Sequence, residues 1–176
     1  MTRCAWLVML AACGGEAGTS IKMAVGDQAP AYGDAPFPTD AVRDGDHVGV
    51  IAGLDKLVAH HADLVTAHVA ALDGFGLRPL VEFPVDGRLD PASIPARTTT
   101  TDVAALVDVD PSSPDRGRVL AMDWRYDVER SVLAGSPASG VVLREGTRYA
   151  AFVTTAIRLR SASARKRPDR NAARSE

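Results

Sequence analysis

The chain has 176 residues, of which 46% are hydrophobic and 24% charged, as expected for one packed globular domain. Its formal net charge of −2 arises because two regions of opposite charge nearly cancel. Residues 14–157 carry 12 basic and 20 acidic side chains, a net charge of −8, and this excess of acid argues against nucleic acid as a partner.

The N-terminus has the order of a secretory signal, a basic residue followed by a short apolar run. Arg3 precedes nine apolar residues, Cys4 to Ala12. This run is much shorter than the roughly 20 residues that a membrane-spanning helix needs. We therefore predict a cleaved signal peptide, with a buried N-terminal strand or helix as the alternative.

Leu10-Ala11-Ala12-Cys13 resembles the lipobox of bacterial lipoproteins, an aliphatic residue and two small residues before the cysteine. The resemblance implies cleavage after Ala12, which removes residues 1–12, and attachment of lipid to the thiol of Cys13. Cleavage would also remove Cys4, so Cys13 would have no partner for an internal disulfide. We expect an exported protein that is anchored to the cell envelope, at the outer membrane, through the lipid on Cys13.

The next segments are predicted as a tether and one helix. Residues 13–36 are rich in Gly, Ala, Asp and Pro and poor in bulky apolar side chains, which predicts a flexible tether. An amphipathic helix is predicted over about residues 54–72, where apolar residues recur on one face, and Asp73-Gly74 is its stop signal. The apolar residues are Leu54, Leu57, Val58, Val65, Val69 and Leu72.

Beyond the helix the apolar period changes to two, which predicts short β-strands between Gly, Pro and Asp turns. The predicted strands cover residues 81–85, 103–109, 120–128, 141–143 and about 148–157. One face of the clearest strand carries Leu120, Met122, Trp124, Tyr126 and Val128, and the other carries Asp123, Arg125 and Asp127. We predict a mainly β fold, an immunoglobulin-like antiparallel β-sandwich over residues 37–157 with the helix added to it.

Residues 158–176 differ in charge from the rest of the chain. They carry 7 basic and 2 acidic side chains, a net charge of +5, and show no apolar stripe, which predicts a disordered basic tail. Binding to nucleic acid or anionic lipid is one alternative for this tail, and an out-of-frame ending of a longer protein is another.

Several stretches resemble two kinds of exported protein: secreted lipoproteins whose N-terminal part precedes a lipase-type hydrolase domain, and immunoglobulin-like domains of surface and S-layer proteins. These stretches are Phe37-Pro38-Thr39-Asp40, Leu72-Asp73-Gly74-Phe75-Gly76, residues 81–87, Leu89-Asp90-Pro91-Ala92-Ser93, Val107-Asp108-Val109-Asp110-Pro111 and residues 143–149. The resemblance implies a β-sandwich that supports or presents a catalytic or adhesive domain. We expect the hydrolase domain, which the resemblance places after residue 157, to be absent from this chain.

A search for catalytic motifs gives no candidate. A lipase-type nucleophile elbow requires Gly-x-Ser-x-Gly, whereas Gly135-Ser136-Pro137-Ala138-Ser139-Gly140 has the wrong spacing and predicts a loop. Neither a phosphate-binding Gly-rich loop nor a His-Glu-x-x-His pair occurs. His61 and His68 share the apolar face of the predicted helix but lie about 10 Å apart along it, too far to share one zinc ion. We expect no enzymatic activity and no cofactor.

Two groups of residues suggest binding sites, each with a structural alternative. Asp108, Asp110 and Asp115 bracket a Pro-rich loop and offer hard oxygen ligands to calcium, although aspartate also favours turns for local reasons. Trp124 and Tyr126 offer an aromatic binding face, whereas their alternation with charged residues favours a place in the core.

Three functions follow from these patterns. The first is a non-catalytic binding or scaffolding role at the cell envelope, with an envelope protein or a hydrolase domain as the partner. The second is the truncated N-terminal part of a secreted lipase or esterase, which an open reading frame downstream encoding Gly-x-Ser-x-Gly would favour. The third is a carrier of a small ligand, which requires a preformed apolar pocket.

Overall fold

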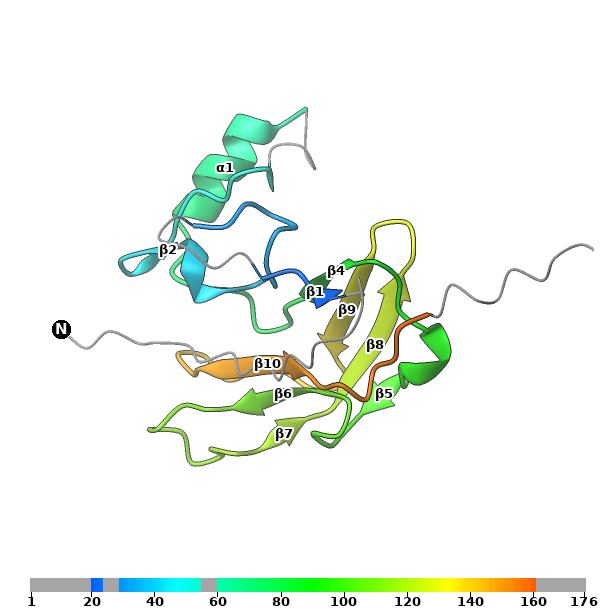
Figure 1. The fold of residues 1–176 in the computed structure, drawn as a ribbon. Coiled ribbons are helices and arrows are strands. Elements are labelled where there is room, and N and C mark those ends of the chain that lie inside the picture. Colours follow the sequence, from blue (N-terminus) through cyan, green and yellow to red (C-terminus); the bar gives the residue numbers. More distant parts are fainter. Residues whose placement is uncertain (1–19, 24–28, 55–59, 161–176) are drawn as a thin grey trace, which may run out of the picture.

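The computed structural model describes residues 20–23, 29–54 and 60–160 (Figure 1). Within these ranges the fold is mainly β, with antiparallel sheets and one α-helix, as the sequence predicted at this level. The larger sheet has the order β1-β4-β9-β8-β5, and the smaller has the order β10-β6-β7. The larger sheet comprises β1 (Ser20–Ile21), β4 (Val81–Asp86), β9 (Val132–Pro137), β8 (Met122–Asp127) and β5 (Arg97–Thr98). The smaller comprises β10 (Tyr149–Val153), β6 (Ala104–Asp108) and β7 (Val119–Leu120).

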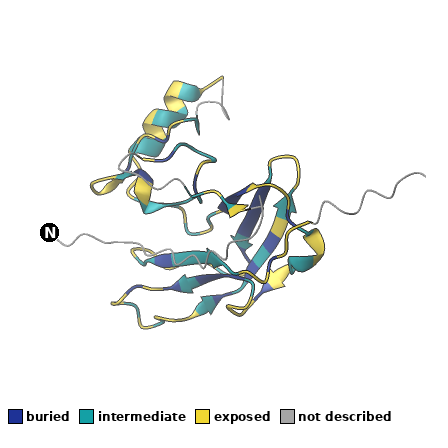
Figure 2. Cartoon of the chain, viewed as in Figure 1, coloured by how far each residue is buried: buried dark blue, intermediate teal, exposed yellow. Residues whose placement is uncertain are grey.

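The two sheets share one hydrophobic core. Only Ala121 separates β7 from β8, so the chain passes from the smaller sheet into the larger one almost without a break. Buried residues from both sheets form a single cluster, and Figure 2 shows them concentrated along the strands. The cluster consists of Val81, Phe83, Val85, Leu89, Ala104, Leu106, Leu120, Met122, Trp124, Leu133, Leu143, Tyr149 and Ile157. Burial of this much apolar surface is the main stabilising contribution to the fold.

The predicted orientation of the strand over residues 120–128 is confirmed for its first part. Leu120, Met122 and Trp124 are buried, while Arg125 on the opposite face is exposed. Val128 is 44% exposed, contrary to the prediction, because β8 ends at Asp127 and Val128 lies in the following turn.

Strand β9 was missed by the sequence analysis. Gly135, Ser136 and Pro137 were predicted as loop, yet they pair with Trp124, Asp123 and Met122 of β8. A side-chain Cβ on Gly135 would lie only 2.3 Å from Cζ3 of Trp124. The indole ring therefore occupies the space above the glycine, and this contact overrides the turn preference of the sequence.

Three other predicted elements differ from the structure. In β6 the core cluster includes Ala104 and Leu106, whereas of the alternating residues within 103–109 Ala105 is buried outside this cluster and Val109 is 39% exposed. Residues 141–143 form no strand, although Leu143 is buried. Helix α1 spans only Ala62–Ala70, and none of its residues is buried. Leu54 lies in a separate turn before it, and Leu57 and Val58 lie outside the described residues. The apolar pattern read over residues 54–72 thus joined two distinct elements.

A second, smaller cluster holds the N-terminal part together. Its buried residues are Val42, Val48 and Ile51, and Val69 of α1 packs against them. Two short elements flank it, the 3-10 helix η1 (Asp40–Val42) and the hairpin of β2 (Arg43–Asp44) with β3 (His47–Val48). The rings of Tyr32, Phe37 and Phe75 add edge-to-face contacts, with centroids 5.6 Å and 5.5 Å apart.

Part of the predicted tether lies against the sheet. Within residues 13–36, β1 pairs antiparallel with β4, and Ala35 is buried. The backbone N–H of Tyr32 donates to the carbonyl of Ala52 at 2.8 Å. At the other end, Arg158 and Arg160 still make backbone contacts with residues 88–93, whereas the basic tail beyond residue 160 lies outside the described residues. A further 3-10 helix, η3 (Pro91–Ser93), lies in this region.

Candidate functional site

The lipobox residues Leu10, Ala11, Ala12 and Cys13 lie outside the described residues. The signal peptide, its cleavage and the lipid on Cys13 therefore stay predictions. None of the described helices is long and apolar enough to cross a membrane.

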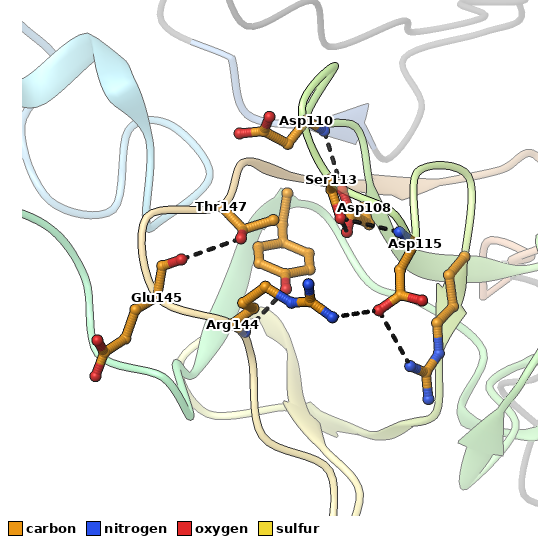
Figure 3. Close-up of polar contacts among 9 residues, drawn as sticks. Asp108, Asp110, Ser113, Asp115, Arg144, Glu145 and Thr147 are labelled. Atoms are coloured by element: carbon orange, nitrogen blue, oxygen red, sulfur yellow. Dashed lines mark hydrogen bonds and ion pairs between the residues drawn. The ribbon is translucent and has the colours of Figure 1, made fainter.

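The aspartates proposed as calcium ligands stabilise their own loop (Figure 3). Asp108 accepts hydrogen bonds from the backbone N–H of Asp110 at 3.0 Å and from the hydroxyl of Ser113 at 2.5 Å. Asp110 accepts from the backbone and hydroxyl of Ser112 at 2.8 and 2.6 Å, and from the backbone N–H of Arg148 at 3.2 Å. These contacts are typical of aspartate-stabilised turns.

The carboxylate of Asp115 has other partners, although its backbone N–H donates to the hydroxyl of Ser113 at 3.2 Å. Its Oδ2 lies 2.7 Å from Nη2 of Arg144 and 3.7 Å from Nη1 of Arg118. The structure thus brings Asp108 and Asp110 into one turn and pairs Asp115 with two arginines (Figure 3). Among the described residues, no group of three or more His, Cys, Asp or Glu side chains is arranged to hold a metal ion.

The histidines and aromatic residues also have structural roles. His61 is the residue before helix α1, and Nδ1 of His68 lies 2.7 Å from the carbonyl oxygen of Leu64. Both residues are exposed, so the prediction that they lie on a buried apolar face is wrong. Trp124 is 5% exposed and donates from Nε1 to the hydroxyl of Thr98 at 2.8 Å, so its ring is part of the core and not of a binding face. Tyr126 packs against the same core.

The most unusual polar cluster was not predicted from the sequence. Glu82 of β4 is buried, with a side chain only 6% exposed, and its Oε1 lies 2.9 Å from Nη1 of Arg130. This contact is an ion pair without hydrogen-bond alignment. The hydroxyl of Tyr32 donates to Oε2 of Glu82 and accepts from Nη2 of Arg130 at 2.9 Å. A buried carboxylate requires such partners, because an unpaired one would lose its hydration without compensation.

This cluster joins three distant parts of the chain. Tyr32 lies in the N-terminal loop, Glu82 in β4, and Arg130 in the turn between β8 and β9. Two backbone hydrogen bonds between Phe37 and Glu82, of 2.9 and 2.6 Å, fix the loop along β4. Phe37 pairs with the edge of β4, and Tyr32 of the same loop reaches the side chain of Glu82, which is buried although it alternates with the core residues of β4.

Burial and the contacts within the cluster shift the pKa values of Tyr32 and Arg130. Burial, followed by the hydrogen bond to Glu82, raises the pKa of the Tyr32 hydroxyl above its ordinary value. The close contact with the Glu82 carboxylate likewise raises the pKa of Arg130. At neutral pH the tyrosine therefore keeps its proton and the guanidinium keeps its charge, as the hydrogen bonds require.

An open pocket of about 290 Å³ adjoins this cluster. Its walls come from β4, from the turn before β9 and from the N-terminal segments that pack against them. The lining residues are Lys22, Tyr32, Gly33, Pro84, Val85, Arg130, Ser131 and Val132. Lys22 and Arg130 are cations, and no carboxylate is part of the lining. We name this feature the Lys22–Arg130 pocket.

No protein-family model matches the chain, and neither the curated proteins nor the solved structures contain a match to it. The function must therefore be inferred from the residues and their arrangement.

Proposed function

We propose that the chain is an exported lipoprotein, anchored by lipid on Cys13, whose folded part has a non-catalytic binding or scaffolding role at the cell envelope. The observation that supports this most directly is the run Leu10-Ala11-Ala12-Cys13, preceded by a basic residue and an apolar stretch. A thiol that carries two or more acyl chains holds a protein stably on a membrane.

The position of β1 fits this anchor. Ser20 is seven residues after Cys13, so β1 begins at most about 25 Å from the lipidated residue. A protein held this closely has its N-terminal side next to the membrane, which suits a component that spaces or binds something at the envelope.

The non-catalytic assignment is supported by the contacts of the acidic side chains, which are engaged in hydrogen bonds and ion pairs within the fold. Asp108 and Asp110 accept hydrogen bonds from their own loop, Asp115 pairs with arginine, and Glu82 pairs with Arg130. Ser136 lies within β9, opposite Asp123, and does not occupy the strand-to-helix turn of a nucleophile elbow. These groups have structural partners where a catalytic site would need a nucleophile beside a base.

For the fold, we propose that the two sheets are the layers of an immunoglobulin-like sandwich. This proposal is supported by the core cluster that the larger and smaller sheets share and by the antiparallel pairing throughout both. A sandwich of this kind suits a binding or spacing module, because its loops gather at the two ends of the layers.

The anchor is tested with the variant Cys13→Ser, expressed in a bacterial host that processes lipoproteins. We expect wild-type protein in the membrane fraction with a mature mass that begins at a lipid-modified Cys13. The variant should be soluble or should retain its signal peptide. Cys4→Ser, which changes the other cysteine, is the matched control and should behave as wild type. Unchanged membrane association and mature mass in Cys13→Ser would contradict the proposal.

A further inference from the structure

The Lys22–Arg130 pocket concentrates positive charge on an acidic body. Residues 14–157 have a net charge of −8, yet the titratable residues that line this pocket are Lys22, Arg130 and Tyr32. With acidic side chains in such excess, a lining of two cations without a carboxylate produces a local positive potential that attracts anions.

The fold fixes the backbone of Lys22 and the guanidinium of Arg130. The backbone N–H of Lys22 donates to the carbonyl of Pro84 at 2.8 Å, which fixes this residue beside β4. Within the described residues the Lys22 side chain takes part in none of the ion pairs. Arg130 is oriented by Glu82 and Tyr32 through its Nη1 and Nη2 atoms. A guanidinium has five N–H groups, so these two contacts leave donors for a ligand.

Glu82 orients Arg130 and also reduces the attraction that an anion experiences. Its carboxylate is only 6% exposed and is turned towards Arg130 and Tyr32, so it does not line the pocket. The formal charges of the lining residues and Glu82 together sum to +1. Ser131, whose φ of 53° places it in the left-handed region, adds a hydroxyl-bearing residue to the lining.

We propose that the Lys22–Arg130 pocket binds an anionic phosphate group. A guanidinium and an ammonium that line one pocket from different segments are a common donor set for phosphate, which offers several oxygens at once. The volume of about 290 Å³ is close to the lower end of the range for small-ligand sites, which suits a phosphate ester rather than a large ligand.

The phosphate has two possible sources, a soluble phosphate ester and the headgroup of an anionic phospholipid. The headgroup source rests on the proposed lipid anchor, because Lys22 is nine residues from Cys13 and thus at most about 32 Å from it. Binding of soluble phosphate does not depend on the anchor, since the pocket is formed by the folded part.

The test uses the full chain with Cys13→Ser, so that lipidation does not contribute. Inorganic phosphate is added in one series, and vesicles of phosphatidylcholine with or without phosphatidylglycerol in another. Amide NMR shifts report the first series, and co-sedimentation reports the second. We expect a saturable response in at least one series, with phosphate shifts concentrated at Gly33, Ser131 and Val132. A response to vesicles alone that Lys22→Gln weakens assigns the headgroup as the source, and a response to free phosphate alone assigns the ester.

Lys22→Gln removes one cation while its backbone contact remains, so the fold should be preserved. We expect affinity to fall at least about tenfold in this variant. Arg125→Gln is the matched control, because Arg125 is exposed on β8 outside the pocket and carries the same charge. Equal weakening in both variants, or no saturable response in either series, would overturn the proposal. Membrane partitioning of the unsubstituted chain measures the anchor separately, so the two failures are distinguishable.

Discussion

Asp110 is a residue whose charge stabilises the folded state through nearby donors. The Asp110 carboxylate accepts hydrogen bonds from the hydroxyl and the backbone N–H of Ser112 and from the backbone N–H of Arg148, and these bonds lower its pKa. A carboxylate with a lowered folded-state pKa stabilises the protein above the pKa of the unfolded chain, and this stabilisation is lost as pH falls through the folded value.

Because the pKa of Asp110 is lowered in the folded state, we predict that part of the loss of stability at low pH depends on this residue. The free energy of unfolding of the wild type should decrease as pH falls below about 4, the ordinary value for aspartate. Asp110→Asn should be less stable than wild type at neutral pH and should show a shallower decrease below pH 4. Urea unfolding at a series of pH values measures both. Asp86→Asn, at an exposed position in β4, is the control for loss of one negative charge. A parallel decrease in wild type and Asp110→Asn would show that this contact does not contribute.

At the scale of elements, the contact of β8 with β9 determines whether the larger sheet can form. The ring of Trp124 lies where a side chain on Gly135 would project, at 2.3 to 2.8 Å from the position of a Cβ atom. Gly135 is therefore required for close approach, and the ring fills the space that a larger residue would have occupied.

We predict that Gly135→Ala destabilises the protein by about 1–3 kcal/mol or more, because the methyl group must displace a ring that is packed in the core. Gly76→Ala is the matched control, since a Cβ there meets no atom within 4 Å and should change stability only slightly. Urea midpoints and slopes for both variants give the comparison. If Gly135→Ala is as stable as Gly76→Ala, Trp124 has another position available and its contact with Gly135 is not a constraint.

The sequence predicted those elements whose pattern is local. The strands containing Val81 and Trp124 were predicted because alternating apolar residues indicate a strand with one buried face. Strand β9 was missed because Gly135 and Pro137 have turn preferences, and its strand conformation depends on pairing with β8. The helix prediction was too long because Leu54 fits the helical period although it lies in a separate turn.

The candidate site depends on contacts that no local pattern reports. Tyr32 and Glu82 are 50 residues apart, and Tyr32 and Arg130 are 98 apart. A signal does exist at Glu82, since a charged residue between Val81 and Phe83 must be either exposed or paired. The sequence alone does not distinguish these two, because the partners Tyr32 and Arg130 are distant from Glu82 along the chain.

At the scale of the whole molecule, two hydrophobic clusters of very different size contribute to the stability of the fold. The main cluster contains 13 buried residues, whereas the N-terminal cluster contains Val42, Val48 and Ile51. Regions with few buried apolar contacts open at lower free energy than the core of the same protein. The Tyr32–Glu82–Arg130 contacts connect the two clusters, but they lie at one point of the boundary.

We therefore predict that the N-terminal cluster opens without unfolding of the sheets. The amide of Val48 donates to Leu72 at 2.7 Å, and that of Trp124 donates to Ala96 at 2.9 Å, so the two hydrogen bonds are similar in length. In native-state hydrogen exchange, Val48 should nevertheless exchange faster than Trp124. Ile51→Ala, which truncates a residue only 4% exposed, should accelerate exchange at Val48 at least about tenfold and leave Trp124 nearly unchanged. Equal acceleration at both amides would instead mean that both clusters unfold as one cooperative unit, with the Glu82 contacts transmitting the loss from one cluster to the other.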